Sequence, residues 1–91
     1  MSEPNPYLAG IIVDIIAERE YQNTRWGNEF DSKNTPNDWV TYICRYACAA
    51  VAMPWEPSQF RTKMVKAAAL CCAAIEWFDR VDGKMPKRHY D

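Results

Sequence analysis

Two carboxylates near the end of the chain have the type and spacing that metal chemistry uses. Glu76 and Asp79 are spaced i, i+3 in a stretch with helical periodicity, so both side chains lie on one face, one turn apart. Oxygen ligands of this kind suit a hard divalent cation such as Mg²⁺, which often bridges to phosphate groups. The alternative is an ordinary solvated helix face beside Arg80. The pair is therefore a candidate half-site for Mg²⁺.

Other catalytic patterns are missing from the sequence. It has no G-x-x-x-x-G-K-[ST], G-x-G-x-x-G, H-E-x-x-H or G-x-S-x-G motif, and its single histidine, His89, lies near the end. The four cysteines lie in Ala-rich helical stretches, without a C-x-x-C knuckle, and we expect them to be reduced, buried, small apolar residues rather than zinc ligands: Cys44, Cys48, Cys71 and Cys72.

Composition limits the class of protein. The 91 residues allow one domain, 1–91, with a small core. Eleven Lys and Arg against 12 Asp and Glu give a net charge of −1, which argues against general nucleic-acid binding. The longest apolar run is far shorter than the roughly 20 residues that span a bilayer, and the first residues lack the features of a signal peptide. We expect a cytoplasmic protein that does not enter a membrane.

Periodicity and capping residues predict three helices, over about 6–24, 36–52 and 58–82. Asn5 and Pro6 suit the start of the first helix. Thr35, followed by Pro36 and then Asp38, forms a variant of the capping box, and Gly83 suits the end of the third helix. Residues 26–36 lack periodicity and are expected to form a loop, either functional or pinned to the core by its aromatic residues. Residues 84–91 form a basic tail.

The apolar residues of each helix recur at helical spacing and are expected to face the core. The stripes are Leu8, Ile11, Ile12, Ile15 and Ile16 in the first helix, Trp39, Val40, Ile43, Tyr46, Ala47, Ala50 and Val51 in the second, and Met64, Val65, Ala68, Cys71, Cys72, Ile75 and Phe78 in the third. The small residues of the second and third helices favour a tight antiparallel hairpin. Because three such helices leave a marginal core, we expect homo-oligomerisation, as a dimer or larger, to complete an all-α bundle.

Three segments together resemble small phage-encoded MazG-like proteins of the all-α nucleoside triphosphate pyrophosphohydrolase class. They are Glu-Arg-Glu-Tyr-Gln at 18–22, Arg-Trp-Gly at 25–27 and the stretch from Lys63 to Arg80 that ends in Ile-Glu-Trp-Phe-Asp-Arg. The resemblance covers about residues 11–82. It implies helices paired across an oligomer interface, and Mg²⁺ held against substrate phosphates by an E-E-x-x-E motif on one helix and an E-x-x-D motif on the next.

The match to these two motifs is half complete. Glu76 and Asp79 fall on E-x-x-D, but residues 45–49 read Arg-Tyr-Ala-Cys-Ala where E-E-x-x-E is expected. Without those acids the Mg²⁺ site loses most of its charge, so the family reaction is not expected. An arginine at the first of these positions could instead contact a phosphate directly.

What remains is a set of groups suited to a nucleotide. Aromatic rings can stack on a base, guanidinium groups can bind phosphate, and amides and a carboxylate lie at a helix N-terminus, which favours anions. For each aromatic residue the alternative is a place in the core, and for the polar residues before Trp39 it is plain capping. The predicted ligand-binding residues are Arg19, Gln22, Trp26, Asn34, Asn37, Asp38, Trp39, Arg45 and Tyr46.

Three functions are therefore open. The first is a catalytically reduced protein that binds or sequesters a nucleotide or a nucleotide-derived signal. The second is a Mg²⁺-dependent pyrophosphohydrolase, in which other acids such as Glu18, Glu20, Glu29 or Asp31 replace the absent ones. The third is a small inhibitor that binds a host protein complex, for which the aromatic residues and the basic tail would form the contact surface.

Overall fold

The computed structural model describes residues 5–32 and 34–88, and within it the side chains of 26–32 are not described. The described residues form three helices and no strands: α1 (Leu8–Ser32), α2 (Pro36–Ala49) and α3 (Pro57–Arg80). The prediction of an all-α protein with three helices is confirmed. None of these helices has both the length and the hydropathy needed to cross a membrane.

The helix ends follow the capping residues in the sequence. Asn5 Oδ1 accepts a hydrogen bond from the backbone N–H of Tyr7 at 2.9 Å, one residue before α1 begins. At α2 the capping box is complete, because Thr35 Oγ1 accepts from the Asp38 N–H and Asp38 Oδ2 accepts from the Thr35 N–H. After α3, Gly83 has a φ of +73° and its N–H donates to the Phe78 carbonyl at 2.9 Å, which closes the helix end.

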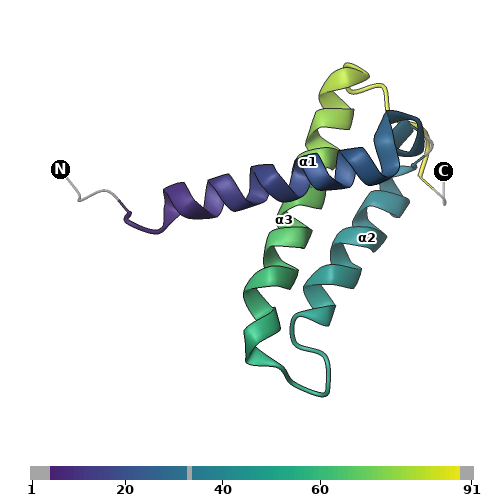
Figure 1. Cartoon of the computed structure of the whole chain (residues 1–91). Coiled ribbons are helices and arrows are strands. Elements are labelled where there is room, and N and C mark those ends of the chain that lie inside the picture. Colours follow the sequence, from purple (N-terminus) through teal and green to yellow (C-terminus); the bar gives the residue numbers. More distant parts are fainter. Residues whose placement is uncertain (1–4, 33, 89–91) are drawn as a thin grey trace.

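The helix α3 is the central element, and both α1 and α2 pack against it (Figure 1). α2 and α3 lie side by side as a hairpin, while α1 crosses α3 and extends its N-terminal half beyond it (Figure 1). The core lies between α2 and α3, where the ring centroids of Trp39 and Trp77 are 6.2 Å apart and Leu70 and Ala73 are buried beside them.

The expected loop at 26–36 is wrong over most of its length, because α1 continues to Ser32. Gly27 is the one strong helix-breaking residue between Trp26 and Ser32, and it costs about 1 kcal/mol relative to alanine. Adding a residue to an existing helix needs no new nucleus, so a stretch without apolar periodicity can still extend one. The connection between α1 and α2 is short as a result.

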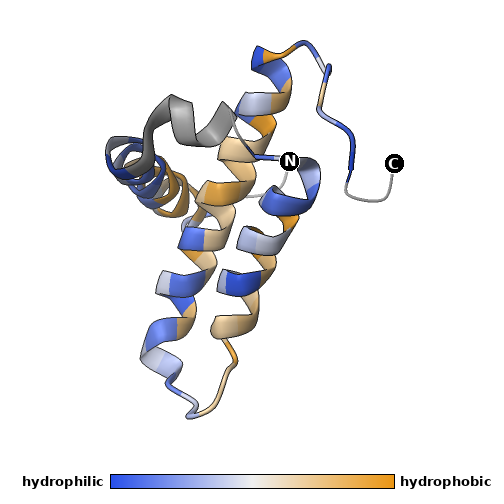
Figure 2. Ribbon diagram, turned by 90° about the vertical axis from the view of Figure 1, so that its right-hand side faces the viewer, coloured by the Kyte–Doolittle hydropathy of each residue, from blue (hydrophilic) through white to orange (hydrophobic). Residues whose placement is uncertain are grey.

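The apolar stripes predicted for the three helices are also wrong in part. In the second, Val40 and Val51 are 59 % and 62 % exposed. Ile12, Ile16 and Ile75 are 46 %, 52 % and 61 % exposed, and all four cysteines are free and exposed rather than buried. On α3 the buried residues are Ala67, Ala69, Leu70, Ala73 and Trp77, a different face from the predicted one. Figure 2 shows hydrophobic residues recurring along the helices. Many of the large apolar residues of α1 and α3 are therefore exposed in the single chain.

Candidate ligand-binding site

A pocket of about 250 Å³ lies where the three helices approach one another, and we call it the Tyr46 pocket. Its α1 wall is one helical face, since the residues that form it are spaced i, i+3, i+4 and i+7. Tyr46 comes from α2 and Lys66 from α3. The described residues that line it are Glu18, Tyr21, Gln22, Arg25, Tyr46 and Lys66.

Lys66 is the central charge of the Tyr46 pocket. Its Nζ lies 3.4 Å from Glu18 Oε1 and 5.9 Å from the centroid of the Tyr46 ring, and Lys63 Nζ lies 6.0 Å from the same centroid. On the α1 wall, Arg25 Nη1 donates to the Tyr21 hydroxyl at 3.2 Å. With Arg25 and Lys66 against Glu18, the described part of the lining carries an excess of positive charge, which favours an anionic ligand.

Gln22 is the buried polar group of this pocket. Its side chain is 3 % exposed, and its Nε2 donates a long hydrogen bond of 3.4 Å to the backbone carbonyl of Lys66. Its Oε1 is buried and has no hydrogen-bond partner. Burying an amide oxygen without a partner costs about 1–3 kcal/mol, so a ligand that donates a hydrogen bond to Oε1, once the side chain turns toward the pocket, would gain affinity.

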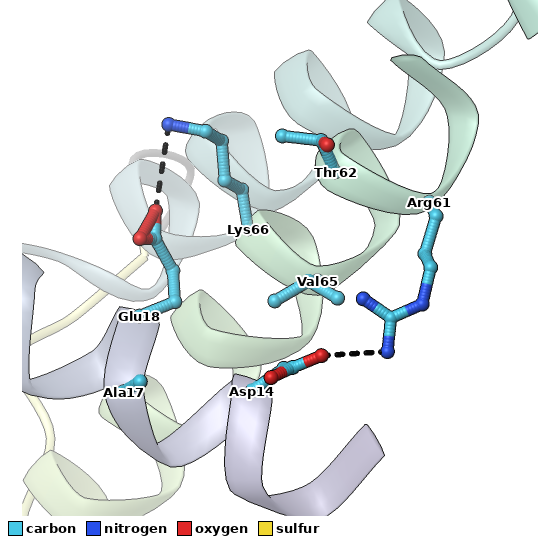
Figure 3. A pocket seen from close by; sticks show the side chains of 7 residues that line it. All are labelled: Asp14, Ala17, Glu18, Arg61, Thr62, Val65 and Lys66. Carbon is cyan, nitrogen blue, oxygen red and sulfur yellow. Dashed lines mark ion pairs between the residues drawn. The ribbon is translucent and has the colours of Figure 1, made fainter. Parts of the chain in front are cut away.

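A neighbouring pocket of about 310 Å³ shares Glu18 and Lys66 with the first, and we call it the Thr62 pocket (Figure 3). An ion pair between Arg61 Nη2 and Asp14 Oδ2, 2.7 Å apart, crosses one side of it. Thr62, Ala17 and Val65 also line it. Each cation here faces a carboxylate, so the described charges of the pocket balance.

The predicted metal pair has a different partner. Arg19 Nε donates to Glu76 Oε2 at 2.6 Å, which joins α1 to α3 through the carboxylate that was expected to bind Mg²⁺. Asp79 is exposed one turn further along α3. Among the side chains described, no group of three or more His, Cys, Asp or Glu residues is placed to hold a metal ion. Two carboxylates alone, one of them bound to arginine, are a poor Mg²⁺ site.

The structure brings together only some of the predicted ligand residues. Gln22 and Tyr46 share the Tyr46 pocket, and Arg19 lies one turn before Gln22 on α1. Trp39 is 3 % exposed in the core, so its ring faces are not available to a base. Arg45 is exposed on α2, outside both pockets described above.

The remaining predictions fall at the start of α2. Asp38 completes the capping box, and the Asn37 carbonyl accepts a hydrogen bond from Thr41 Oγ1, as expected of residues with a structural role. Asn34 is 5 % exposed, and its Nδ2 is buried without a hydrogen-bond partner. The side chain of Trp26 lies outside the described residues.

Several pocket residues were not in the predicted set. Tyr21, Thr62 and Arg61 line the two pockets, as do Asp14 and Glu18. Their spacing carried part of a signal, because Asp14, Glu18 and Gln22 recur every fourth residue on one helix face, and Asp14 is the one charged residue between Leu8 and Ala17.

Chemically, this site offers cations and aromatic rings on one side and paired carboxylates and a hydroxyl on the other. It contains hydrogen-bond donors and acceptors for an anionic organic ligand. No protein-family model matches the chain, and no match was found among curated proteins or solved structures.

Proposed function

We propose that this chain is a MazG-like protein of phage type that binds a nucleotide or a nucleotide-derived signal without hydrolysing it. The observation that carries the proposal is the unpartnered Oε1 of buried Gln22 in a pocket that also holds Lys66 and Arg25. A buried acceptor beside cations is the arrangement that a ligand with both N–H donors and a phosphate would complete.

The Tyr46 pocket suits each part of a nucleotide. Tyr21 and Tyr46 supply aromatic rings, on which a base can stack with a gain of about 1–3 kcal/mol. Gln22 Oε1 and the Glu18 carboxylate can accept hydrogen bonds from a base, and Lys66 and Arg25 can bind phosphate oxygens. The resemblance of residues 18–22 and 63–80 to MazG-like proteins supports the same ligand class.

We expect no turnover because the chain lacks most of the acidic residues that the family reaction needs. Family chemistry needs a Mg²⁺ ion held by several carboxylates, and residues 45–49 supply none of them. Glu76 is bound by Arg19, so releasing it to a metal would break the link between α1 and α3. These facts favour binding over pyrophosphate release.

Self-association is part of the proposal. The N-terminal half of α1 extends beyond α3 and exposes Leu8, Ile12 and Ile16. An apolar groove of about 300 Å³ between this half of α1 and the start of α3 is lined by Ile11, Ile15, Phe60, Arg61, Met64, Val65 and Ala68. Residues 5–16 contain one charged residue, Asp14, and no cation that would draw them to an anionic membrane. A second copy of this chain offers the matching apolar stripe.

Calorimetric titration of the purified chain with AMP, ADP, ATP and the guanine and uridine equivalents tests the binding. We expect at least one of them to bind, and we expect Gln22→Leu to weaken that binding at least tenfold. The same variant should keep or raise the thermal midpoint, because leucine fills a similar volume and leaves no unpaired oxygen. Gln59→Ala, an exposed position at the start of α3, is the matched control and should change neither property.

Two results would overturn the proposal. One is the absence of binding by every nucleotide tested. The other is Mg²⁺-dependent release of pyrophosphate from a nucleoside triphosphate that Glu76→Ala abolishes, which would make the chain a working pyrophosphohydrolase. If no nucleotide binds and one host protein is recovered with the chain in stoichiometric amount, the inhibitor function is favoured instead.

A further inference from the structure

The Tyr46 pocket alone is small for the ligand class proposed above. Its volume of about 250 Å³ falls below the range of roughly 300–1,000 Å³ that small-molecule sites occupy. The Thr62 pocket adds about 310 Å³ and shares Glu18 and Lys66 with it, so the two form neighbouring compartments on either side of one ion pair. Together they fall within that range.

The two compartments differ in chemistry. The Tyr46 pocket has aromatic rings and an excess of positive charge. None of the described residues that line the Thr62 pocket is aromatic, and their charges are balanced, since Asp14 pairs with Arg61 and Glu18 with Lys66 (Figure 3). Without an excess of positive charge, this second compartment attracts a phosphate less than the Tyr46 pocket does.

A neutral group with several hydroxyls fits the Thr62 pocket. Each carboxylate uses one oxygen in its ion pair and keeps the other as an acceptor, and the Thr62 hydroxyl can both donate and accept. Vicinal hydroxyls of a sugar supply donors for those oxygens. Lys66, on the boundary between the pockets, is the cation that a linking phosphate group would meet.

We infer that the ligand is a nucleoside diphosphate joined to a sugar, with its base in the Tyr46 pocket, its phosphates at Lys66 and its terminal sugar in the Thr62 pocket. The inference rests on the proposed function and names its ligand class. The terminal sugar should contribute affinity that the nucleoside diphosphate alone cannot gain.

Paired calorimetric titrations test this inference. One pair compares ADP with ADP-ribose and the other compares UDP with UDP-glucose, so that both a purine and a pyrimidine base are tested. In at least one pair the sugar-bearing ligand should bind about tenfold more tightly. Thr62→Val keeps the shape and removes the hydroxyl, so it should weaken that ligand about fivefold, as loss of one hydrogen bond predicts, and leave the diphosphate unchanged. Thr41→Val, at an exposed position on α2, is the control and should alter neither affinity.

The results separate this inference from the proposed function. Equal affinity for the diphosphate and its sugar conjugate in both pairs overturns the inference and leaves nucleotide binding in place. An equal effect of Thr62→Val on both members of a pair also overturns it, since the hydroxyl would then act on the shared part. Failure of every nucleotide to bind overturns both.

Discussion

Two of the ion pairs that join α1 to α3 differ in how far water reaches them. In the Arg19–Glu76 pair the arginine side chain is 13 % exposed, whereas both partners of the Arg61–Asp14 pair are about half exposed. We expect Arg19→Met to lower the free energy of unfolding by about 1–2 kcal/mol, as for a charge-assisted hydrogen bond with one partly solvated partner. Urea denaturation measures this.

Arg61→Met is the matched control, because an exposed pair contributes little. The expected loss is below about 0.5 kcal/mol. A double-mutant cycle with Glu76→Gln isolates the coupling between Arg19 and Glu76. Equal losses for Arg19→Met and Arg61→Met would mean that burial does not distinguish the two pairs.

The thiol of Cys71 gives a pH-dependent prediction. Partial burial, and secondarily the neighbouring Cys72, raise the pKa of Cys71 above its ordinary value of 9.0. Because the raised pKa reduces the thiolate fraction at every lower pH, alkylation of Cys71 should be slower than that of an ordinary thiol below pH 9, and its rate should level off only above pH 9. Peptide mass spectrometry after iodoacetamide pulses measures the profile, and the same residue in urea is the control. An inflection at the same pH in folded and unfolded chains would contradict the shift.

Residue types alone distinguished core residues from pocket residues only in part. Trp39 and Tyr46 are both aromatic residues on one helix at helical spacing, yet Trp39 packs on Trp77 while Tyr46 borders a pocket. The difference depends on where α1 crosses α3, which periodicity within α2 does not encode. Gln22 was among the predicted ligand-binding residues, but its burial was not predicted. That burial results from the same crossing of α1 over α3.

At the scale of elements, the N-terminal cap of α2 was predictable because its interactions are local. Thr35 and Asp38 satisfy each other's backbone N–H groups within four residues of sequence. We expect Thr35→Ala to cost about 1 kcal/mol of stability through loss of the side-chain acceptor. Thr41→Ala, on the exposed surface of the same helix, should cost less than half of that, and comparable losses in chemical denaturation would exclude capping as the reason.

The length of α1 and the buried face of α3 were not predictable in the same way. Residues 26–32 lack a periodic apolar stripe, so nothing in them signalled the helix that continues through Ser32. On α3, apolar residues occur nearly all round, from Met64 to Phe78, and composition could not select which of them meet α1 and α2. The buried face of α3 consists mainly of small residues, because alanine at positions 67, 69 and 73 lets the neighbouring helices approach α3 closely.

At the scale of the whole molecule, few large apolar residues are buried and many are exposed. Apart from alanines, the buried apolar residues among those described are Trp39, Leu70 and Trp77. Meanwhile Leu8, Ile12 and Ile16 on α1 and Ile75 and Phe78 on α3 are exposed. A core this small contributes little stability, and the exposed stripes are where a second copy would add more.

If association supplies part of the stability, unfolding must depend on protein concentration. Each tenfold increase in concentration adds roughly 1.4 kcal/mol to the free energy of unfolding a dimer, so the thermal midpoint should rise by several degrees. Ile12→Glu places a charge within the apolar stripe of α1 and should yield a monomer by light scattering, with a lower and concentration-independent midpoint. Gln59→Glu adds the same charge at an exposed polar position and should behave like the wild type. A wild-type monomer with a constant midpoint would instead show that the hairpin and one crossing helix are stable alone, and that the apolar stripes of α1 and α3 remain in water.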